Sequence, residues 1–362
     1  MNTSTALLKA MIARANYLDG IERATLRKML PILESAHESV LGKIAKTRGK
    51  YTAEWLAEMA ADLQEIYDTA SVKAYGAIRG DLEKLAQAEG AWIDGEIGQT
   101  AVGVSFTAPA PSLLWAVVEA LPASNGATLD QLFAALSDTS RAAAYEAISS
   151  GMIAGDTVDQ LASRLRGDVV KRASWRKIDG KRTYVPGVYS GGAIEGVTTR
   201  QAEMIARTAA MHVSNAARDQ FYRANEDVIK GYQYVATLDL RTCLICGNDD
   251  GRVFAADEPR PQLPRHPGDR CLYVPVLKSW KELGIDGDEL PGSTRASMDG
   301  QVAETVTFAD RLKSASRAQR VEMLGKSRAE LYDQGLPLSA MVEGGRVLTL
   351  NEIAAKRRGR AA

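Results

Sequence analysis

The side chains that could bind a metal ion are crowded into one short stretch of this 362-residue chain. All three cysteines and one of the three histidines lie within 29 residues, in the order Cys243-x2-Cys246 and, nineteen residues later, His266-x4-Cys271. A CxxC turn directs two thiolates at one cation, and zinc accepts three cysteines and one histidine at about 2.0–2.3 Å per ligand. We therefore predict a structural zinc site; the alternative is three free cysteines in or near a core.

A catalytic zinc site would need an open coordination position and a nearby acid or base. Asp249, Asp250 and Asp269 are close in sequence, but the sequence has neither an HExxH motif nor the HxE…CxxC motif of deaminases. His37 and His212 lie in distant helical segments, and we expect His212 to be a partly buried helix residue rather than a ligand. The prediction is that the chain is not an enzyme.

The segment TLDLRTC places Asp239 and Arg241 just before the first cysteine. Residues i and i+2 at the end of a strand share one face, so this pair can form an ion pair that shapes the cysteine loop. A solvated turn is the other interpretation.

Three short strands must position these loops. The segments YQYVATLD, GRVF and LYVPVLK are rich in aromatic and β-branched residues, and the cysteine pair and the histidine fall in the loops around them. A helix over about 199–224 precedes the strands, with Thr198 and Gln201 spaced as a capping box. Because such a small sheet has little core of its own, a metal ion would staple it.

The first 165 residues predict helix after helix. An amphipathic helix over about 53–88 carries an apolar stripe at a spacing of three or four, and Pro31 predicts a kink or turn in the helix before it. A stripe this long needs a partner to cover it. We therefore predict that the start of the stripe binds a partner protein, through Trp55, Met59, Leu63 and Ile66.

The rest of the chain adds a hairpin and a helical end. Asp179-Gly180 between two β-prone arms indicates a hairpin insertion, residues 284–293 predict a Gly/Pro/Asp linker, and helices follow from Thr307. The basic tail is typically solvated, but it is also a possible DNA contact through Lys356, Arg357, Arg358 and Arg360.

These elements predict a mainly α fold with a small α+β module. The expected parts are a helical arm (1–165), a module of one helix and short antiparallel strands held by a CCHC zinc knuckle (166–285), and a helical C-terminal segment (286–362).

The composition argues against several classes of protein: those that bind DNA through their overall charge, secreted disulfide-rich proteins and membrane proteins. Lys and Arg number 45, as do Asp and Glu, so any DNA contact must be a local patch rather than a whole-protein charge. Three cysteines are too few for a secreted disulfide framework. The first twenty residues lack a basic region followed by an apolar block, so we expect no signal peptide. The longest strongly apolar run, 113–118, is too short to cross a bilayer, and we expect no membrane partner.

The segments RQAEMIARTAAMHVSNAA, GYQYVATLDLRTCLICGNDDGRVF and PRHPGDRCLYVPV together resemble the phage Mu F-like minor head protein family, the phage head morphogenesis proteins. The family pattern is an Ile-Ala-Arg-Thr helix, an aromatic strand, Asp-x-Arg-Thr-Cys-x-x-Cys, Asp-Gly and His-Pro-x-Cys-Arg-Cys. The similarity covers about residues 195–350. This chain has Asp269 where the pattern places a cysteine, so Asp269 either replaces a ligand or is a residue of the loop.

The resemblance implies a minor capsid protein of a tailed phage, incorporated in few copies during procapsid assembly at the portal vertex. Its expected partners are the portal protein and the major capsid or scaffold protein, with DNA as a further possibility. Its expected locations are the interior of the virion head and, during assembly, the host cytoplasm. Two alternatives stay open: a nucleic-acid-binding zinc module that acts on packaged or ejected DNA, and a phage-encoded enzyme of the toxin, transferase or nuclease type.

Overall fold

The computed structural model describes residues 5–47, 51–100, 106–171, 174–178, 180–185, 188–279, 281–283, 294–297, 300–303 and 305–361. Most of these residues are helical, and the described strands form small antiparallel sheets. This agrees with a mainly α fold that carries a small α+β module. Within the described residues, no helix combines the length and the apolar character needed to cross a membrane.

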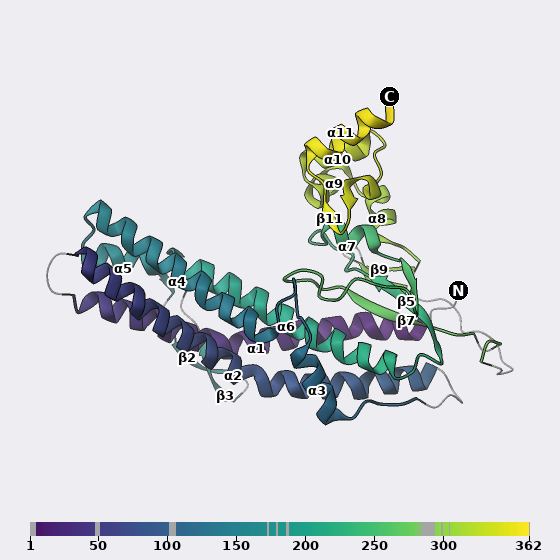
Figure 1. The fold of residues 1–362 in the computed structure, drawn as a ribbon, viewed down its shortest axis with the longest axis horizontal. Helices are drawn as coiled ribbons and strands as arrows, with labels where there is room; N and C mark the ends of the chain where they lie inside the picture. The colour runs from purple at the N-terminus through teal and green to yellow at the C-terminus, as the bar shows by residue number, and fades with distance from the viewer. Residues whose placement is uncertain are drawn as a thin grey trace.

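Four long helices form an elongated bundle: α1 (Thr5–Ala45), α2 (Ala53–Thr100), α4 (Leu129–Ala154) and α6 (Glu195–Arg223) (Figure 1). The short helices α3 (Pro111–Ala120) and α5 (Val158–Arg166) pack against it. Apolar residues at helical spacing on α1, α2, α4 and α6 meet in one continuous core. Capping boxes at Thr128 and Thr157 fix the starts of α4 and α5.

Two boundary predictions were wrong in this bundle. Helix α1 continues through Pro31, because Met29 and Leu33 on either side of the proline are both buried in the core and hold the chain helical. Helix α6 begins at Glu195, so Thr198 does not cap it. The Thr198 hydroxyl is buried instead, 3.0 Å from the hydroxyl of Ser140 on α4.

The apolar stripe of α2 is largely covered by the chain itself. Met59 and Leu63 are buried in the bundle core, so the prediction that they bind a partner protein is corrected: α1, α4 and α6 supply the cover that the sequence alone did not reveal. Trp55 and Ile66 are partly exposed and pack against the edge of the same core.

A buried charge cluster ties three of these helices together. The Glu89 carboxylate on α2 is inaccessible to solvent, and it accepts hydrogen bonds from Arg14 on α1 and from Arg218 and Ser214 on α6, at 2.7–2.9 Å. Removing one partner would leave a charge buried without compensation, so the cluster fixes how α1, α2 and α6 pack.

The predicted hairpin is present as a two-part ribbon. Strands β2 (Ser174–Ile178) and β3 (Lys181–Val185) pair with a two-residue loop that contains Gly180. Strands β1 (Gly167–Lys171) and β4 (Val188–Gly191) pair at the base of the ribbon. Gly180 has φ +79°, the left-handed conformation that a two-residue hairpin turn requires.

The three predicted strands near the cysteines form one antiparallel sheet in the order β6–β5–β7. Its members are β5 (Ile229–Val235), β6 (Val253–Ala255) and β7 (Leu272–Leu277). One unpredicted helix, α7 (Leu244–Asp249), follows the first cysteine. The sheet core includes Leu7 and Met11 of α1 and Ile93 and Ile97 of α2. Residue 165 is therefore not a packing boundary, because the ends of α1 and α2 complete the core of the sheet module.

The C-terminal lobe, residues 305–361, stands out from the bundle (Figure 1). The helices predicted after Thr307 include α9 (Arg317–Leu324) and α10 (Lys326–Asp333), which are separated at Gly325. The other elements of the lobe are α8 (Phe308–Ser314), a 3-10 turn (Leu338–Met341), β10 (Val342–Glu343), β11 (Arg346–Val347) and α11 (Leu350–Ala361).

An unpredicted hairpin, β8 (Thr294–Ser297) with β9 (Gly300–Ala303), precedes the lobe, so the segment after 286 is not purely helical. The predicted linker, 284–293, lies outside the described residues.

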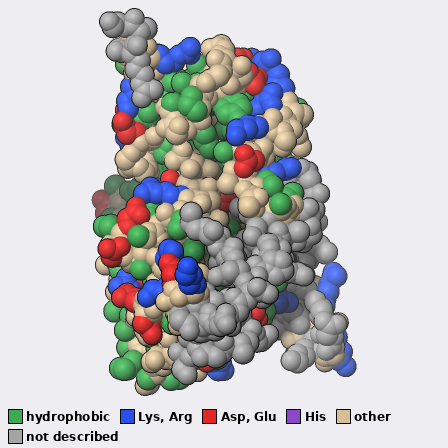
Figure 2. All heavy atoms as spheres, turned by 90° about the vertical axis from the view of Figure 1, so that its right-hand side faces the viewer, with side chains coloured by type: hydrophobic (Ala, Val, Ile, Leu, Met, Phe, Trp, Pro, Cys, Tyr) green, Lys and Arg blue, Asp and Glu red, His purple; other side chains and the backbone are tan. Residues whose placement is uncertain are grey.

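The lobe is basic although the whole chain is neutral. Residues 305–362 carry 11 Lys and Arg against six Asp and Glu. On the face seen in Figure 2, Lys and Arg side chains border the upper part of the molecule, where this lobe lies.

Candidate metal centre

The first half of the site is the start of α7. Cys243 is the N-cap of this helix, and its sulfur accepts a hydrogen bond from the backbone N–H of Cys246 at 3.4 Å. This turn brings both sulfurs to the same side. The next residue is Gly247, and no larger residue fits there, because an added Cβ would lie 2.4 Å from the ring of Phe308. Through this contact α8 of the C-terminal lobe packs against α7.

The second half is the loop 264–271, which together with 243–246 we call the Cys/His knuckle. The His266 Nε2 atom lies 3.2 Å from the Cys243 sulfur and 3.4 Å from the Cys246 sulfur. The potential ligand atoms of Cys243, Cys246 and His266 all lie within 4.8 Å of one another. Those of Cys246, Asp269 and Cys271 form a second such group, which shares Cys246 with the first. The four predicted ligands therefore fall into two adjoining groups, with Cys246 common to both.

The orientation of the imidazole suits metal binding. The Nδ1–H of His266 donates to the backbone oxygen of Pro267 at 3.1 Å, which leaves Nε2 as the nitrogen that faces the two sulfurs. A hydrogen bond of this kind fixes the tautomer of metal-binding histidines. Three thiols and one imidazole nitrogen are a donor set that suits zinc, and the half-buried to buried positions limit access of water.

The close contacts in the knuckle shift the pKa values of its thiols and its imidazole. The hydrogen bond from the Cys246 thiol and the adjacent His266 lower the pKa of Cys243 to about 4, while contacts with the sulfurs of Cys243 and Cys246 raise the pKa of His266 to about 11. Burial raises the pKa of Cys271 to about 11. The cluster thus favours a thiolate beside an imidazolium, and a divalent cation would compete with the protons for the same lone pairs.

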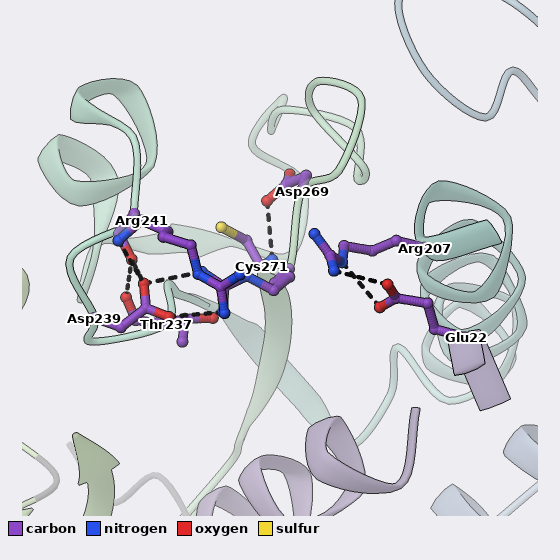
Figure 3. A network of polar contacts seen from close by, with 9 residues as sticks. Glu22, Arg207, Thr237, Asp239, Arg241, Asp269 and Cys271 are labelled. Atoms are coloured by element: carbon purple, nitrogen blue, oxygen red, sulfur yellow. Dashed lines mark hydrogen bonds and ion pairs between the residues drawn. The ribbon is translucent and has the colours of Figure 1, made fainter. Parts of the chain in front are cut away.

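Asp269 organises the knuckle loop. Its carboxylate is buried and accepts the backbone N–H of Cys271 at 2.9 Å through Oδ1 (Figure 3). Through Oδ2 it accepts the backbone N–H of Arg265 at 2.7 Å. Oδ1 also lies 3.8 Å from the Cys246 sulfur. Because both carboxylate oxygens hold backbone amides, the geometry favours a loop residue over a fifth ligand.

The predicted ion pair between Asp239 and Arg241 is corrected. Asp239 pairs with Arg270, whose guanidinium donates two hydrogen bonds at 2.7 and 2.9 Å, and Arg241 contributes its backbone N–H to Asp239 at 2.9 Å (Figure 3). The chain turns after Asp239, so the side chain two residues on does not share its direction. The Arg270 contact lowers the pKa of Asp239 against the opposing effect of burial. This pair links the two halves of the knuckle.

Helix α6 supplies contacts that the sequence did not single out. Thr208 accepts the backbone N–H of Gly268 at 2.9 Å, and Asn215 donates to the backbone oxygen of Cys271 at 3.1 Å. Arg207 makes a two-pronged ion pair with Glu22 on α1 at 2.7 and 2.9 Å (Figure 3). The Ile-Ala-Arg-Thr segment therefore contacts the knuckle through Thr208 and the bundle through Arg207. Its place in the family pattern indicated that it matters, but its composition did not indicate these contacts.

The Asp-Gly segment after the cysteines joins the module to the C-terminal lobe. Asp250 accepts the backbone N–H of Ala236 at 2.8 Å and that of Phe308 at 2.7 Å. Gly251 has φ +83°, and an added Cβ there would lie 2.7 Å from the side chain of Thr307. Only glycine suits both the conformation and the space.

His212, which was expected not to be a ligand, and the basic residues of the tail lie away from the knuckle. His212 is buried on α6 and its Nε2 lies 2.8 Å from the backbone oxygen of Val118, and burial lowers its pKa. Lys356, Arg357 and Arg358 are exposed on α11, with Lys356 paired to Glu343. The side chain of Arg360 lies outside the described residues.

Comparisons with known proteins relate one part of the chain to a family. No curated protein and no solved structure matches the chain significantly. A family model does match: residues 143–272 correspond to the family described as Phage Mu protein F like protein. The match runs from α4 through α6 to the start of β7 and ends just after the last knuckle cysteine. Residues 143–272 of this chain are therefore similar to the Phage Mu protein F like family.

Proposed function

We propose that the chain is a minor head protein of a tailed phage, incorporated in few copies at the portal vertex during procapsid assembly. The observation that carries the proposal is the family match over 143–272, which spans α6 and the complete Cys/His knuckle. The portal protein and the major capsid or scaffold protein are its partners. The chain acts in the host cytoplasm during assembly and then inside the head, and no catalytic role is part of the proposal.

In this proposal zinc is a structural staple. Bound to Cys243, Cys246, His266 and Cys271, it would join α7 to the loop before β7. The gathering of three thiols and one imidazole around the end of a three-stranded sheet supports such a cross-link. A rigid module would present α6, the ribbon and the C-terminal lobe in fixed positions for docking.

The test is a quantitative mass-spectrometric inventory of purified proheads and mature particles from the phage that encodes the chain. The expected result is a few copies per particle in both, co-purifying with the portal protein after mild disruption of the head. Absence from both kinds of particle would contradict the proposal. A copy number near that of the major capsid protein would contradict the placement at a single vertex.

The basic C-terminal lobe favours DNA contact as a second candidate function. Its excess of positive charge, 11 basic against six acidic residues, is local, as a neutral chain would require. DNA contact would then rest on the lobe rather than on the zinc module, because the knuckle arginines Arg265 and Arg270 are already paired with Asp249 and Asp239.

A further inference from the structure

The central strand of the sheet carries a buried tyrosine beside the Cys/His knuckle. In the register of β5 with β7, Tyr234 lies opposite Tyr273, and the two rings meet edge to face with their centroids 5.5 Å apart. Residues two positions apart in a strand share one face, so Tyr234 shares a face of the sheet with Tyr273 and with Cys271, which immediately precedes β7. Cys246 of α7 is buried in the same core.

The hydroxyl of Tyr234 differs from those of the tyrosines around it. The Tyr273 hydroxyl donates to the backbone oxygen of Pro261 at 2.7 Å, and the Tyr222 hydroxyl donates to the backbone oxygen of Tyr273 at 3.3 Å. The Tyr234 side chain is inaccessible to solvent, yet its hydroxyl has no hydrogen-bond partner within the part of the chain that the structure describes. Burying a hydroxyl without a partner costs free energy, so an orphaned group of this kind calls for an explanation.

The polar groups that act on this hydroxyl belong to the knuckle. Burial raises the pKa of Tyr234, and the nearby Cys271 and Cys246 raise it further. Burial also raises the pKa of Cys271, whereas the Tyr234 hydroxyl acts in the opposite direction and lowers it. The hydroxyl therefore lies close enough to the knuckle sulfurs to interact with them, as the register of the sheet requires.

A bound metal ion changes what these sulfurs can accept. A neutral thiol is a weak hydrogen-bond acceptor, whereas a cysteine that binds a metal does so as a thiolate. Hydrogen bonds to a charged acceptor are about twice as strong as those between neutral groups. Side chains that donate to metal ligands from the surrounding shell also orient those ligands and tune the affinity for the metal. A buried donor with no other partner is therefore suited to a metal-bound thiolate.

We propose that Tyr234 supports the zinc site by donating its hydroxyl hydrogen to the thiolate of Cys271 when the ion is bound. This inference rests on the structural zinc of the proposed function, and it adds a residue that the spacing of the ligands does not reveal. The hydrogen bond gives the orphaned hydroxyl a partner and gives the buried negative charge on sulfur a donor. Both gains require the bound ion, so Tyr234 raises the affinity for zinc without being a ligand.

The test compares Tyr234→Phe with Tyr222→Phe in the full-length chain. Each substitution removes one hydroxyl from a buried ring of the same core, but the Tyr222 hydroxyl faces a backbone oxygen instead of the knuckle sulfurs. Competition with a chromophoric chelator measures zinc affinity. Tyr234→Phe is expected to bind about one zinc ion per chain with about tenfold lower affinity, and Tyr222→Phe is expected to bind zinc like the unmodified chain.

Two further measurements separate this role from a loss of packing. In the cobalt(II)-substituted chain, Tyr234→Phe should move the sulfur-to-cobalt charge-transfer band to longer wavelength, because a thiolate that loses a hydrogen-bond donor gives up an electron more easily. Without metal, thermal unfolding of Tyr234→Phe should occur at the same temperature as that of the unmodified chain or at a higher one, because the substitution deletes an unpaired buried hydroxyl. Zinc should then raise the melting temperature of the variant by less than it raises that of the unmodified chain.

Each outcome decides the proposal. Weaker zinc binding by Tyr234→Phe, together with the shifted cobalt band and an unaffected Tyr222→Phe, would support it. Equal zinc affinity, an unmoved cobalt band, equal weakening in both variants or a destabilised metal-free Tyr234→Phe would each overturn it while leaving the zinc staple intact. An unmodified chain that binds neither zinc nor cobalt(II) would overturn this proposal and the zinc staple together.

Discussion

Asp269 occupies the position where the family pattern has a cysteine, and its surroundings explain how a carboxylate serves there. Each of its oxygens holds a backbone amide of the loop that carries His266 and Cys271. The loop therefore keeps its shape through hydrogen bonds, and four ligands are still available for a tetrahedral ion.

Asp269→Asn is expected to keep about one zinc ion per chain while lowering the free energy of unfolding by about 1–3 kcal/mol, because one of two charge-assisted hydrogen bonds in a buried site is removed. Elemental analysis and urea denaturation measure the two quantities. Loss of zinc from a variant that remains folded would instead make Asp269 a ligand.

If zinc is bound as proposed, Cys243→Ser is expected to remove it and to destabilise the sheet module by about 3 kcal/mol or more, because the substitution deletes one of the proposed thiolate ligands. Hydrogen exchange should rise in β5, β7 and α7. It should also rise at the ends of α1 and α2 that share the core of the sheet, while the middle of the bundle stays protected.

Treating the unmodified chain with a chelator provides the control for that experiment, since it removes the ion without changing a side chain. If the unmodified chain contains no metal and the variant melts like it, the staple hypothesis is wrong.

At the scale of elements, α11 combines exposed basic residues with a position at the outer end of the C-terminal lobe (Figure 1). Among its described basic side chains, Lys356 pairs with Glu343, and Arg357 donates a long hydrogen bond of 3.5 Å to Gln334. A helix of this kind can contact phosphates without reading sequence.

Replacing Lys356, Arg357 and Arg358 together with alanine should weaken binding to duplex DNA and reduce the slope of log K against log salt by up to about 3, roughly one for each phosphate that the helix no longer binds. Fluorescence anisotropy at several salt concentrations measures both. A matched triple-alanine variant of the exposed Arg23, Arg27 and Lys46 on and just after α1 should behave like the unmodified chain. Equal effects of the two triple variants would show that the lobe is not the DNA site.

At the scale of the whole molecule, the helical arm and the sheet module share their cores. Helix α6 lies within the module in sequence, yet Ala202, Ile205, Ala209 and Val213 on it are buried in the bundle with α1, α2 and α4. The buried Glu89 cluster crosses the same contact. Truncation of α1 and α2 would therefore test folding rather than docking, and point variants are the appropriate probes of partner surfaces.

A fragment limited to residues 166–285 is expected to expose the apolar face of α6 and to unfold without cooperativity, even with zinc present. Enhanced fluorescence of a hydrophobic dye and a broad thermal transition would report this state, with the full-length chain as the control. A sharp transition and no dye binding would show that the module folds alone.

The sequence by itself determined what depends on local spacing. The three strands near the cysteines and the hairpin at Gly180 are set by neighbouring residues. The four candidate ligands are recognised by their spacing, and the family resemblance rests on the short segments around them.

Only the tertiary structure decided contacts between distant segments. The cover over Met59 and Leu63, the partner of Asp239 and the continuation of α1 through Pro31 all depend on elements far away in the chain. An amphipathic stripe indicates that one face of a helix is buried, but it does not identify the residues that cover it. A carboxylate indicates that a cation or another hydrogen-bond donor lies nearby, but it does not identify that donor. The packing of α1, α2, α4 and α6 supplies those answers.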